Sequence, residues 1–427
     1  MKRVVGLWGA VWMGLGSILG TGVFVSLGIA TGIIGAGVVL AVALAAMVAT
    51  FNGLSSAQLA AAHPVSGGTY AYGHRFVHPV AGFTAGWMFL VAKSASAASA
   101  ALGCAGYLLH TLGMGGDVAA RVGVALALAL ALTVLVAGGL RRSSGANVVI
   151  VSLTLLSLAG FVVSGWMTVE PQRIAERVGP TAWAGAPGLP SSLFQATALL
   201  FVAYTGYGRI ATLGEEVREP SRTIPQAIIT TLAVSMVLYV AVAATAVAAA
   251  GPERFAASTH EAAAPLEVIA RGFRHPGMAW WVAIGAITAM AGVLLNLLLG
   301  LSRVLLAMAR RGEMPVWLGR IDARTHGPTR AVWTMGGVTA ALVLLGDLRA
   351  TWSLSALTVL VYYGLTNLAA LRLPPQARRY PRWIAWAGVV SCFGLVFFIG
   401  WQVWIAGLGL LGLGFLLRGL GRSRSAG

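Results

Sequence analysis

Hydrophobic positions along the chain form long runs that short polar segments separate. The runs extend to about 20 residues or more, whereas buried strands of a soluble α/β protein are apolar over about 4 to 8 residues. An α-helix of this length crosses a hydrocarbon core of about 30 Å, and lipid offers no hydrogen-bond partner to an open backbone. The pattern therefore predicts an all-α membrane protein. Twelve transmembrane segments are expected, at residues 5–32, 35–62, 80–112, 118–139, 145–168, 191–214, 225–250, 277–309, 329–346, 351–371, 383–399 and 401–418.

Two of these segments, the first and the sixth, carry glycine clusters near their centres, at Gly16 to Gly22 and at Tyr204 to Gly208. Each glycine costs a helix about 1 kcal/mol relative to alanine, so both clusters predict a break. Glycine also serves close helix packing in membranes, and the chain has 56 glycines, so either cluster alone is compatible with packing. Their matching positions favour a transporter site at the interface of two inverted repeats.

This interpretation divides a single polytopic membrane domain, residues 1–427, into three parts. Segments one to five, residues 5–168, form the first repeat, and segments six to ten, residues 191–371, form the second. Residues 383–418 supply two additional helices. The expected fold is thus a five-plus-five inverted-repeat core, with discontinuous first and sixth helices.

Composition and charge agree with a membrane protein. With 58% hydrophobic and 10% charged residues, the chain lacks the polar surface that a soluble protein of 427 residues needs. The net charge of +17 does not indicate nucleic acid binding, because no solvated domain gathers the basic residues. They concentrate instead in alternate loops, as at Arg141 and Arg142, and in the tail. The positive-inside rule then predicts a multi-pass protein of the inner (plasma) membrane with both termini cytoplasmic.

The chain carries little that favours a metal, a cofactor or catalysis. Cys104 and Cys392 both lie inside apolar segments, which favours packing over a disulfide or a zinc site. An intramembrane enzyme needs His, Asp or Glu clustered within the membrane, and the histidines fall mostly in loops. We expect no enzyme, no cofactor, no metal and no obligate protein partner. Lipid surrounds the helices.

Several motifs together resemble the amino acid–polyamine–organocation superfamily of permeases. The resemblance covers roughly the first 315 residues, and the last four segments add little beyond their number. The motifs are Gly16 to Phe24, Pro64 to Tyr70, Gly86-Trp87, Glu215 to Pro225, Ser302-Arg303 and Ala307 to Arg310. We expect the charged cluster Glu215, Glu216 and Arg218 to act as a structural latch, holding neighbouring basic loops in place without taking part in chemistry.

The two predicted breaks suggest where a substrate binds. Unwound backbone at Thr21 and Gly22 offers N–H donors to a carboxylate at the positive end of a half-helix. In related permeases the substrate's amino group meets carbonyls of the sixth segment. The resemblance therefore implies backbone sites at Ile18 and, around Gly206, at Val202, Ala203 and Thr205. Tyr204 and Tyr207 flank this break, where they either close over a substrate as an aromatic gate or serve as packing aromatics.

Lys93 is a candidate for proton coupling. Lys2 and Lys93 are the only lysines among 29 basic residues, and Lys93 lies about 9 Å beyond Trp87 along the third segment. An ionisable residue within the membrane is costly and predicts a function. A desolvated ammonium can release its proton, whereas a guanidinium stays charged. The alternative is a lysine that snorkels to the membrane interface.

The chain also departs from the superfamily at three places. Thr154 to Ser157 contain no lysine where some proton-linked relatives have one, and Ala289 to Gly292 lack the hydroxyls of sodium-dependent relatives. Gly208-Arg209 replaces an acidic residue common after the sixth-segment break, which disfavours a cationic substrate. We expect Arg209 to pair with Glu215 or Glu216, with a position on the substrate route as the alternative.

The sequence therefore predicts a proton-coupled secondary transporter of small neutral amino acids that works by alternating access. The alternatives are a sodium-independent exchanger of amino acids or polyamines and a non-transporting amino acid sensor.

Overall fold

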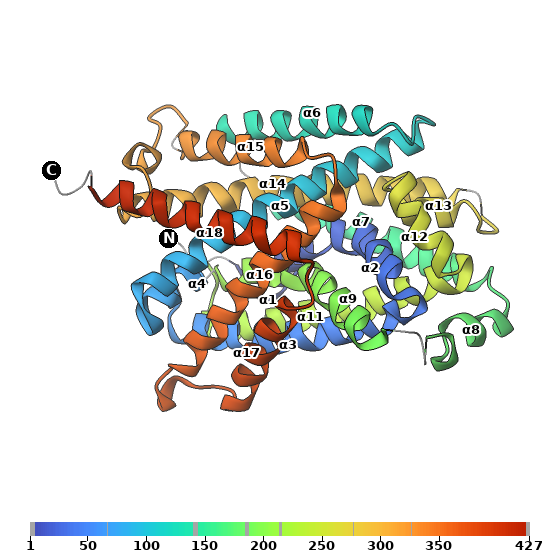
Figure 1. Cartoon of the computed structure of the whole chain (residues 1–427), viewed down its shortest axis with the longest axis horizontal. Helices are drawn as coiled ribbons and strands as arrows, with labels where there is room; N and C mark the ends of the chain where they lie inside the picture. The colour runs from blue at the N-terminus through green and yellow to red at the C-terminus, as the bar shows by residue number, and fades with distance from the viewer. Residues whose placement is uncertain are drawn as a thin grey trace.

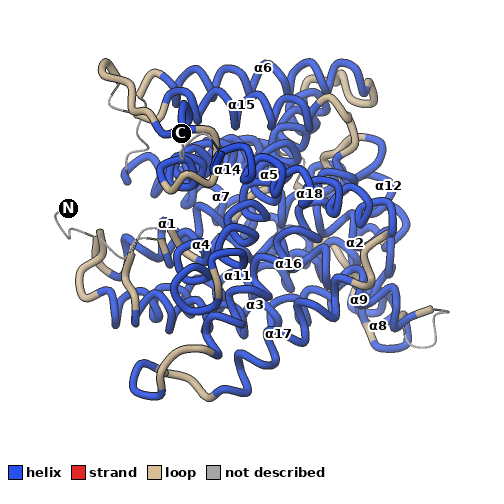
Figure 2. The backbone as a smooth tube through the Cα atoms, turned by 60° about the vertical axis from the view of Figure 1, so that its left-hand side comes forward, coloured by secondary structure: helices blue, strands red, loops and turns tan. Residues whose placement is uncertain are grey.

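The computed structural model describes residues 5–65, 67–139, 144–183, 188–212, 216–275, 277–325 and 327–423. Lys2, Arg141, Arg142 and Glu215 lie outside these ranges, as does Ser66 within the motif Pro64 to Tyr70. In the described ranges the chain is helical, and β-structure is limited to one isolated bridge. The helices pack side by side, many nearly parallel to the long axis (Figures 1 and 2).

The described elements are as follows in chain order: α1 (Leu7–Ile18), η1 (Gly22–Ser26), α2 (Leu27–Ile34), η2 (Gly35–Gly37), α3 (Val38–Ala62), α4 (Thr69–Tyr72), η3 (Gly73–Val77), α5 (Pro79–Thr111), α6 (Val118–Ala137), α7 (Ser144–Trp166), α8 (Pro171–Val178), η4 (Pro180–Ala182), α9 (Leu189–Tyr204), η5 (Thr205–Tyr207), α10 (Gly208–Ala211), α11 (Pro220–Ala250), α12 (Pro252–Glu261), α13 (Pro265–Ala270), α14 (Met278–Arg310), η6 (Val316–Gly319), α15 (Thr329–Val343), α16 (Leu348–Leu371), η7 (Pro375–Ala377), α17 (Arg382–Val396) and α18 (Trp401–Ser423).

Eight helical stretches in the described part of the chain are long and apolar enough to cross a membrane. The first, Leu7–Ala62, contains the predicted segments one and two. The predicted segments six, nine and eleven correspond to α9, α15 and α17, whose 15 or 16 residues are short for a full crossing. For α9 the reason is local, because its α-helix ends at the glycine cluster. The count of twelve spans stays a prediction.

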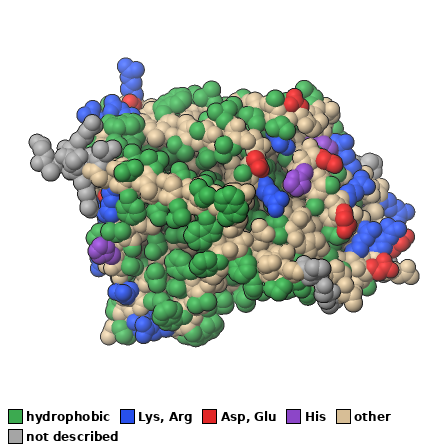
Figure 3. Space-filling view, in the orientation of Figure 1, with side chains coloured by type: hydrophobic (Ala, Val, Ile, Leu, Met, Phe, Trp, Pro, Cys, Tyr) green, Lys and Arg blue, Asp and Glu red, His purple; other side chains and the backbone are tan. Residues whose placement is uncertain are grey.

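The outer surface fits a lipid environment. In Figure 3 hydrophobic side chains cover the middle of the visible face, and charged side chains gather toward its two ends. Leu130, Val237, Ile405 and Leu416 are among the large apolar side chains that are more than half exposed. Such a band is expected where acyl chains replace water as the solvent.

The centre of the bundle is built on α5, which packs against both α14 and α16. Its inner positions are mostly alanine, glycine and serine, such as Ala97, Ala101 and Gly103, so neighbouring backbones approach closely. α6 and α18 lie at the periphery (Figure 1). α5 therefore presents its polar residues, including Lys93, to the interior of the protein.

The two glycine clusters interrupt the α-helix in different ways. α1 ends at Ile18, Leu19 has an extended conformation, and the chain continues as the π-helix η1. In the sixth segment the chain stays helical but tightens from α9 into the 3₁₀ turn η5 and then α10. Thr205 explains part of this tightening, since its hydroxyl donates to the carbonyl of Val202.

Backbone hydrogen bonds join the segment after α10 to the residues just before α1, and the expected latch to basic loops stays a prediction. Val5 and Val217 pair in the isolated bridge, with the Val5 N–H donating to the Glu216 carbonyl at 3.1 Å. The Arg218 N–H donates in turn to the Val5 carbonyl at 2.9 Å. The start of α1 is therefore tied to the segment that follows α10, and both interrupted helices are joined at one end.

Candidate functional site

The two interrupted segments lie directly against each other. A Cβ atom added at Gly22 would lie 2.6 Å from the Cβ of Ala203, and one added at Gly206 would lie 2.6 Å from the Ile18 nitrogen. Real Cβ atoms essentially never approach other atoms under 3.0 Å, so both positions require glycine for this packing. The structure thus brings together Ile18, Gly22, Ala203 and Gly206, four of the residues named from the sequence.

Each carbonyl implied for the substrate's amino group has a hydroxyl partner in the structure. Tyr239 of α11 donates to the Ile18 carbonyl at 2.9 Å, and its hydroxyl lies 3.4 Å from the Ala203 carbonyl. Tyr363 of α16 donates to the Thr205 carbonyl at 3.0 Å. The Val202 carbonyl accepts from the Thr205 hydroxyl at 2.8 Å. The polar groups of both breaks therefore face one another and a small set of tyrosines.

Thr21 lies at the start of η1, on the side proposed for the carboxylate. Its side chain is buried, at 3% exposure, and its hydroxyl has no hydrogen-bond partner among the described residues. A buried hydroxyl without a partner costs about 1 to 3 kcal/mol, which a ligand oxygen would relieve. Asn296 of α14 also contacts the first-segment break, donating to the Gly16 carbonyl at 3.3 Å.

Tyr204 and Tyr207 are fully buried in the conformation described. The Tyr204 ring packs 5.0 Å from the ring of Tyr239, and the Tyr207 ring packs 5.4 Å from that of Tyr363. Both rings take part in the packing around the sixth-segment break. Their role as a gate stays a prediction.

Lys93 reaches the sixth-segment break. Its Nζ donates to the Thr205 hydroxyl at 2.9 Å, and that hydroxyl donates to the Val202 carbonyl. A snorkelling lysine would direct its ammonium to the membrane surface, whereas this ammonium ends at the helix interruption. Lys93, Thr205 and Val202 therefore form one chain of hydrogen bonds from α5 into the candidate site.

Arg209 directly follows the break, as the second residue of α10, and is partly buried. Two charged groups act on its guanidinium: Arg303 of α14 repels it, and Glu216 attracts it. Glu215, the other partner expected, lies outside the described residues. The surroundings of the break thus carry Lys93 and Arg209, two positive charges.

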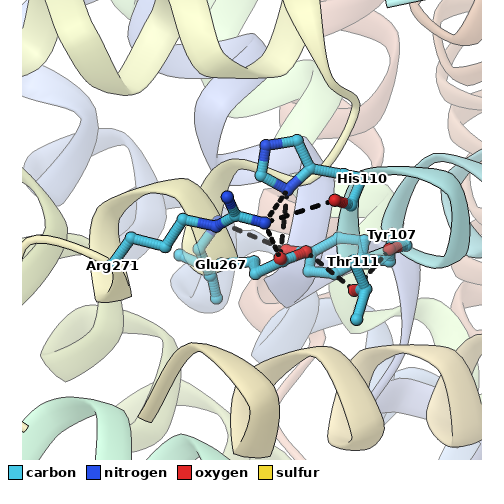
Figure 4. Close-up of polar contacts among 6 residues, drawn as sticks. Tyr107, His110, Thr111, Glu267 and Arg271 are labelled. Atoms are coloured by element: carbon cyan, nitrogen blue, oxygen red, sulfur yellow. Dashed lines mark hydrogen bonds and ion pairs between the residues drawn. The ribbon is translucent and has the colours of Figure 1, made fainter. Parts of the chain in front are cut away.

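A second polar cluster joins α5 and α13 (Figure 4). Glu267 of α13 is buried and pairs with Arg271 at 2.9 Å and with His110, at the end of α5, at 3.0 Å. Tyr107 of α5 donates to the Phe24 carbonyl of η1 at 2.8 Å and accepts from the Leu266 N–H at 3.2 Å. These contacts tie η1 to α13 and α5 beyond the first-segment break.

Another buried carboxylate, Glu313, organises the loop after α14. It accepts from Tyr70 at 2.7 Å and from Arg418 of α18 at 2.9 Å, and it lies 3.2 Å from a His74 ring nitrogen. Burial lowers the pKa of His74, an effect that the Glu313 carboxylate partly offsets. This cluster joins the segment between α3 and α5 to the last helix.

Sequence reasoning did not identify Tyr239, Tyr363 or Asn296, although each contacts a break. The available signal was a polar side chain within an otherwise apolar run. Lys93 stands out in the sequence on the same ground, but the contact of its ammonium with Thr205 depends on the packing of α5 against the sixth segment.

The chain is similar in sequence to known amino acid permeases and transporters. The family model for amino acid permeases matches residues 9–418. An uncharacterized transporter of Mycobacterium tuberculosis is 39% identical over 99% of this chain and 92% of the relative. A branched-chain amino acid permease of Bacillus subtilis is 27% identical over 94% of this chain and 89% of the relative. Cationic amino acid transporter 1 of Arabidopsis thaliana is 24% identical, over 89% of this chain and 63% of the relative.

Proposed function

Because this chain belongs to the amino acid permease family, we propose that it moves small neutral amino acids across the membrane by proton-coupled alternating access. Its family and its apolar helices make it an integral membrane protein, and its relatives are transporters and not enzymes. The observation that carries the proposal is the meeting of the two interrupted segments, with the Lys93 ammonium bonded to Thr205 at their junction.

The substrate would bind with its two backbone groups on the two breaks. Its carboxylate would take the N–H groups of Thr21 and Gly22 and the free Thr21 hydroxyl, near the positive end of η1. Its ammonium would meet the carbonyls of Ile18 and Ala203. The close approach of Gly22 to Ala203 leaves little space beside these groups, which supports a small side chain.

Charge supports a neutral side chain over a cationic one. The Lys93 ammonium ends at the break, and Arg209 directly follows the break in the chain. A cationic side chain placed there would be repelled by both groups. Two like unit charges 4 Å apart near a protein surface repel each other by about 4 kcal/mol. The relative named as a branched-chain amino acid permease is consistent with this preference.

Proton coupling would use Lys93. When protonated, its ammonium donates a charge-assisted hydrogen bond to Thr205, and loss of the proton weakens that hydrogen bond and removes a positive charge from the break. Because Thr205 also donates to Val202, this change reaches the backbone of the sixth segment. We propose that sodium takes no part, since Ala289 to Gly292 supply no hydroxyl side chain.

The topology forms part of the same proposal. Residues 5–168 and 191–371 would be the two inverted repeats and 383–418 the additional helices, giving twelve spans in the inner (plasma) membrane with cytoplasmic termini. The bridge between Val5 and Val217 supports joint movement of the two interrupted helices during alternating access.

The substrate class is tested by thermal stabilisation of the purified protein across the twenty amino acids and common polyamines. A ligand at 100 times its dissociation constant stabilises the folded state by about 2.7 kcal/mol. We expect small neutral amino acids to raise the melting temperature. Stabilisation by polyamines alone would favour a polyamine exchanger, and no stabilisation by any amino acid or amine would refute the proposal.

A further inference from the structure

The Tyr239 hydroxyl contacts both interrupted segments. Tyr239 is fully buried in α11, donates to the Ile18 carbonyl at 2.9 Å, and lies 3.4 Å from the Ala203 carbonyl. Its ring packs against Tyr204, which holds the phenol in place. A single side chain from a continuous helix thus bridges the first and the sixth segment.

Both carbonyls belong to the last turn of a helix, where backbone oxygens lack the usual partner four residues on. Ile18 is the final residue of α1, and Ala203 is the second-last residue of α9. In a buried site such oxygens need another donor, since an unsatisfied buried acceptor destabilises the folded state. Tyr239 supplies that donor when no ligand is present.

We infer that the Tyr239 hydroxyl occupies the ammonium subsite of the empty transporter and that the amino group of the substrate replaces it there. The inference rests on the proposed function and adds a residue to its site. An ammonium has three donors and a phenol has one, so the ammonium can satisfy both carbonyls at once. The bond from Tyr239 to Ile18 is then lost, or weakened, each time substrate binds.

Loss of the Tyr239 hydroxyl should raise the affinity for amino acids. Removing the hydroxyl destabilises the empty state, because its carbonyls lose their donor, while the bound state keeps the donors of the substrate. Tyr239→Phe should therefore bind amino acids more tightly. A hydrogen bond contributes about 0.5 to 1.5 kcal/mol, which corresponds to an increase in affinity of about 2-fold to 12-fold.

Two other roles predict different results. A hydroxyl that contacts the bound substrate would make Tyr239→Phe bind more weakly. A hydroxyl that only stabilises the fold would lower stability equally with and without ligand, leaving affinity unchanged. The sign of the change in affinity therefore separates the three roles.

The test compares binding of L-valine and of 3-methylbutanoate, which has the same carboxylate and side chain without the amino group, by calorimetry on purified protein. We expect Tyr239→Phe to bind valine 2-fold to 12-fold more tightly than wild type, with no gain for 3-methylbutanoate. Tyr107→Phe is the matched control, since Tyr107 is also buried and donates to a backbone carbonyl, that of Phe24, at 2.8 Å. It should bind valine within about 2-fold of wild type.

Failure of the Tyr239 inference can be told apart from failure of the proposed function. If wild type binds valine but Tyr239→Phe binds it equally or more weakly, or gains as much for 3-methylbutanoate, the inference is wrong and the proposed function stands. If wild type binds no amino acid, the proposed function fails as well. Should empty Tyr239→Phe unfold, purification in saturating valine should restore folding and 3-methylbutanoate should not, and a failure of valine to rescue would overturn the inference.

Discussion

Replacing Gly206 by alanine should separate binding at the two breaks from general stability. The added Cβ would lie 2.6 Å from the Ile18 nitrogen and closer still to the Ser17 carbonyl group. All of these atoms are backbone, so the first-segment break must move away. Overpacking of this kind costs about 1 to 3 kcal/mol, and if the cost falls on the binding arrangement, affinity drops about 5-fold to 150-fold.

The control is Gly300→Ala in α14, where an added Cβ meets nothing within 4 Å. Alanine there should be neutral or stabilise the helix by up to about 1 kcal/mol. The assay is valine binding by calorimetry, with melting temperatures for wild type and both variants. Unchanged valine affinity in a folded Gly206→Ala would refute the assignment of the site to the junction of the two segments. Gly206→Val, with a bulkier branched side chain, should abolish binding.

Lys93→Arg keeps the charge but cannot release a proton, so its uptake should lose dependence on a pH gradient; a response like that of wild type would exclude Lys93 as the proton carrier. Uptake should persist when choline replaces sodium at fixed pH, and a strict sodium requirement would contradict the account. Burial lowers the pKa of His74 below its unfolded value, so the folded state favours the neutral ring. The free energy of unfolding should fall as the pH drops through about 6.5, and His74→Gln should flatten this dependence in acid melting curves.

The helices and their interruptions could be predicted from local sequence. Runs of apolar residues define helices such as α5 and α14, and the glycines at 16, 20 and 22 mark the end of α1. The end of α9 is harder to predict. The α-helix stops where the 3₁₀ turn η5 begins, whereas the apolar run in the sequence continues past that point. The short helices α12 and α13 fall in a segment without a membrane-length apolar run, so the hydropathy pattern gave no signal for them.

The contacts of the candidate site depend on tertiary packing. Tyr239 is 221 residues from Ile18, and Lys93 is 112 residues from Thr205. Neither pairing has a signature in local sequence, since both follow from how α11 and α5 pack on the broken segments. Residue types did indicate that Lys93 was unusual, and glycine clustering indicated where the α-helix would be interrupted. The partners of those backbone atoms came only from the structure.

The most direct test of the central claim is uptake of labelled valine by the purified protein in liposomes under an imposed proton gradient. The account predicts accumulation of valine above its external concentration, driven by the gradient and abolished by a protonophore. Binding of valine without any uptake by folded protein would instead indicate a sensor. Exchange of valine that does not respond to the proton gradient would contradict proton coupling and favour an exchanger.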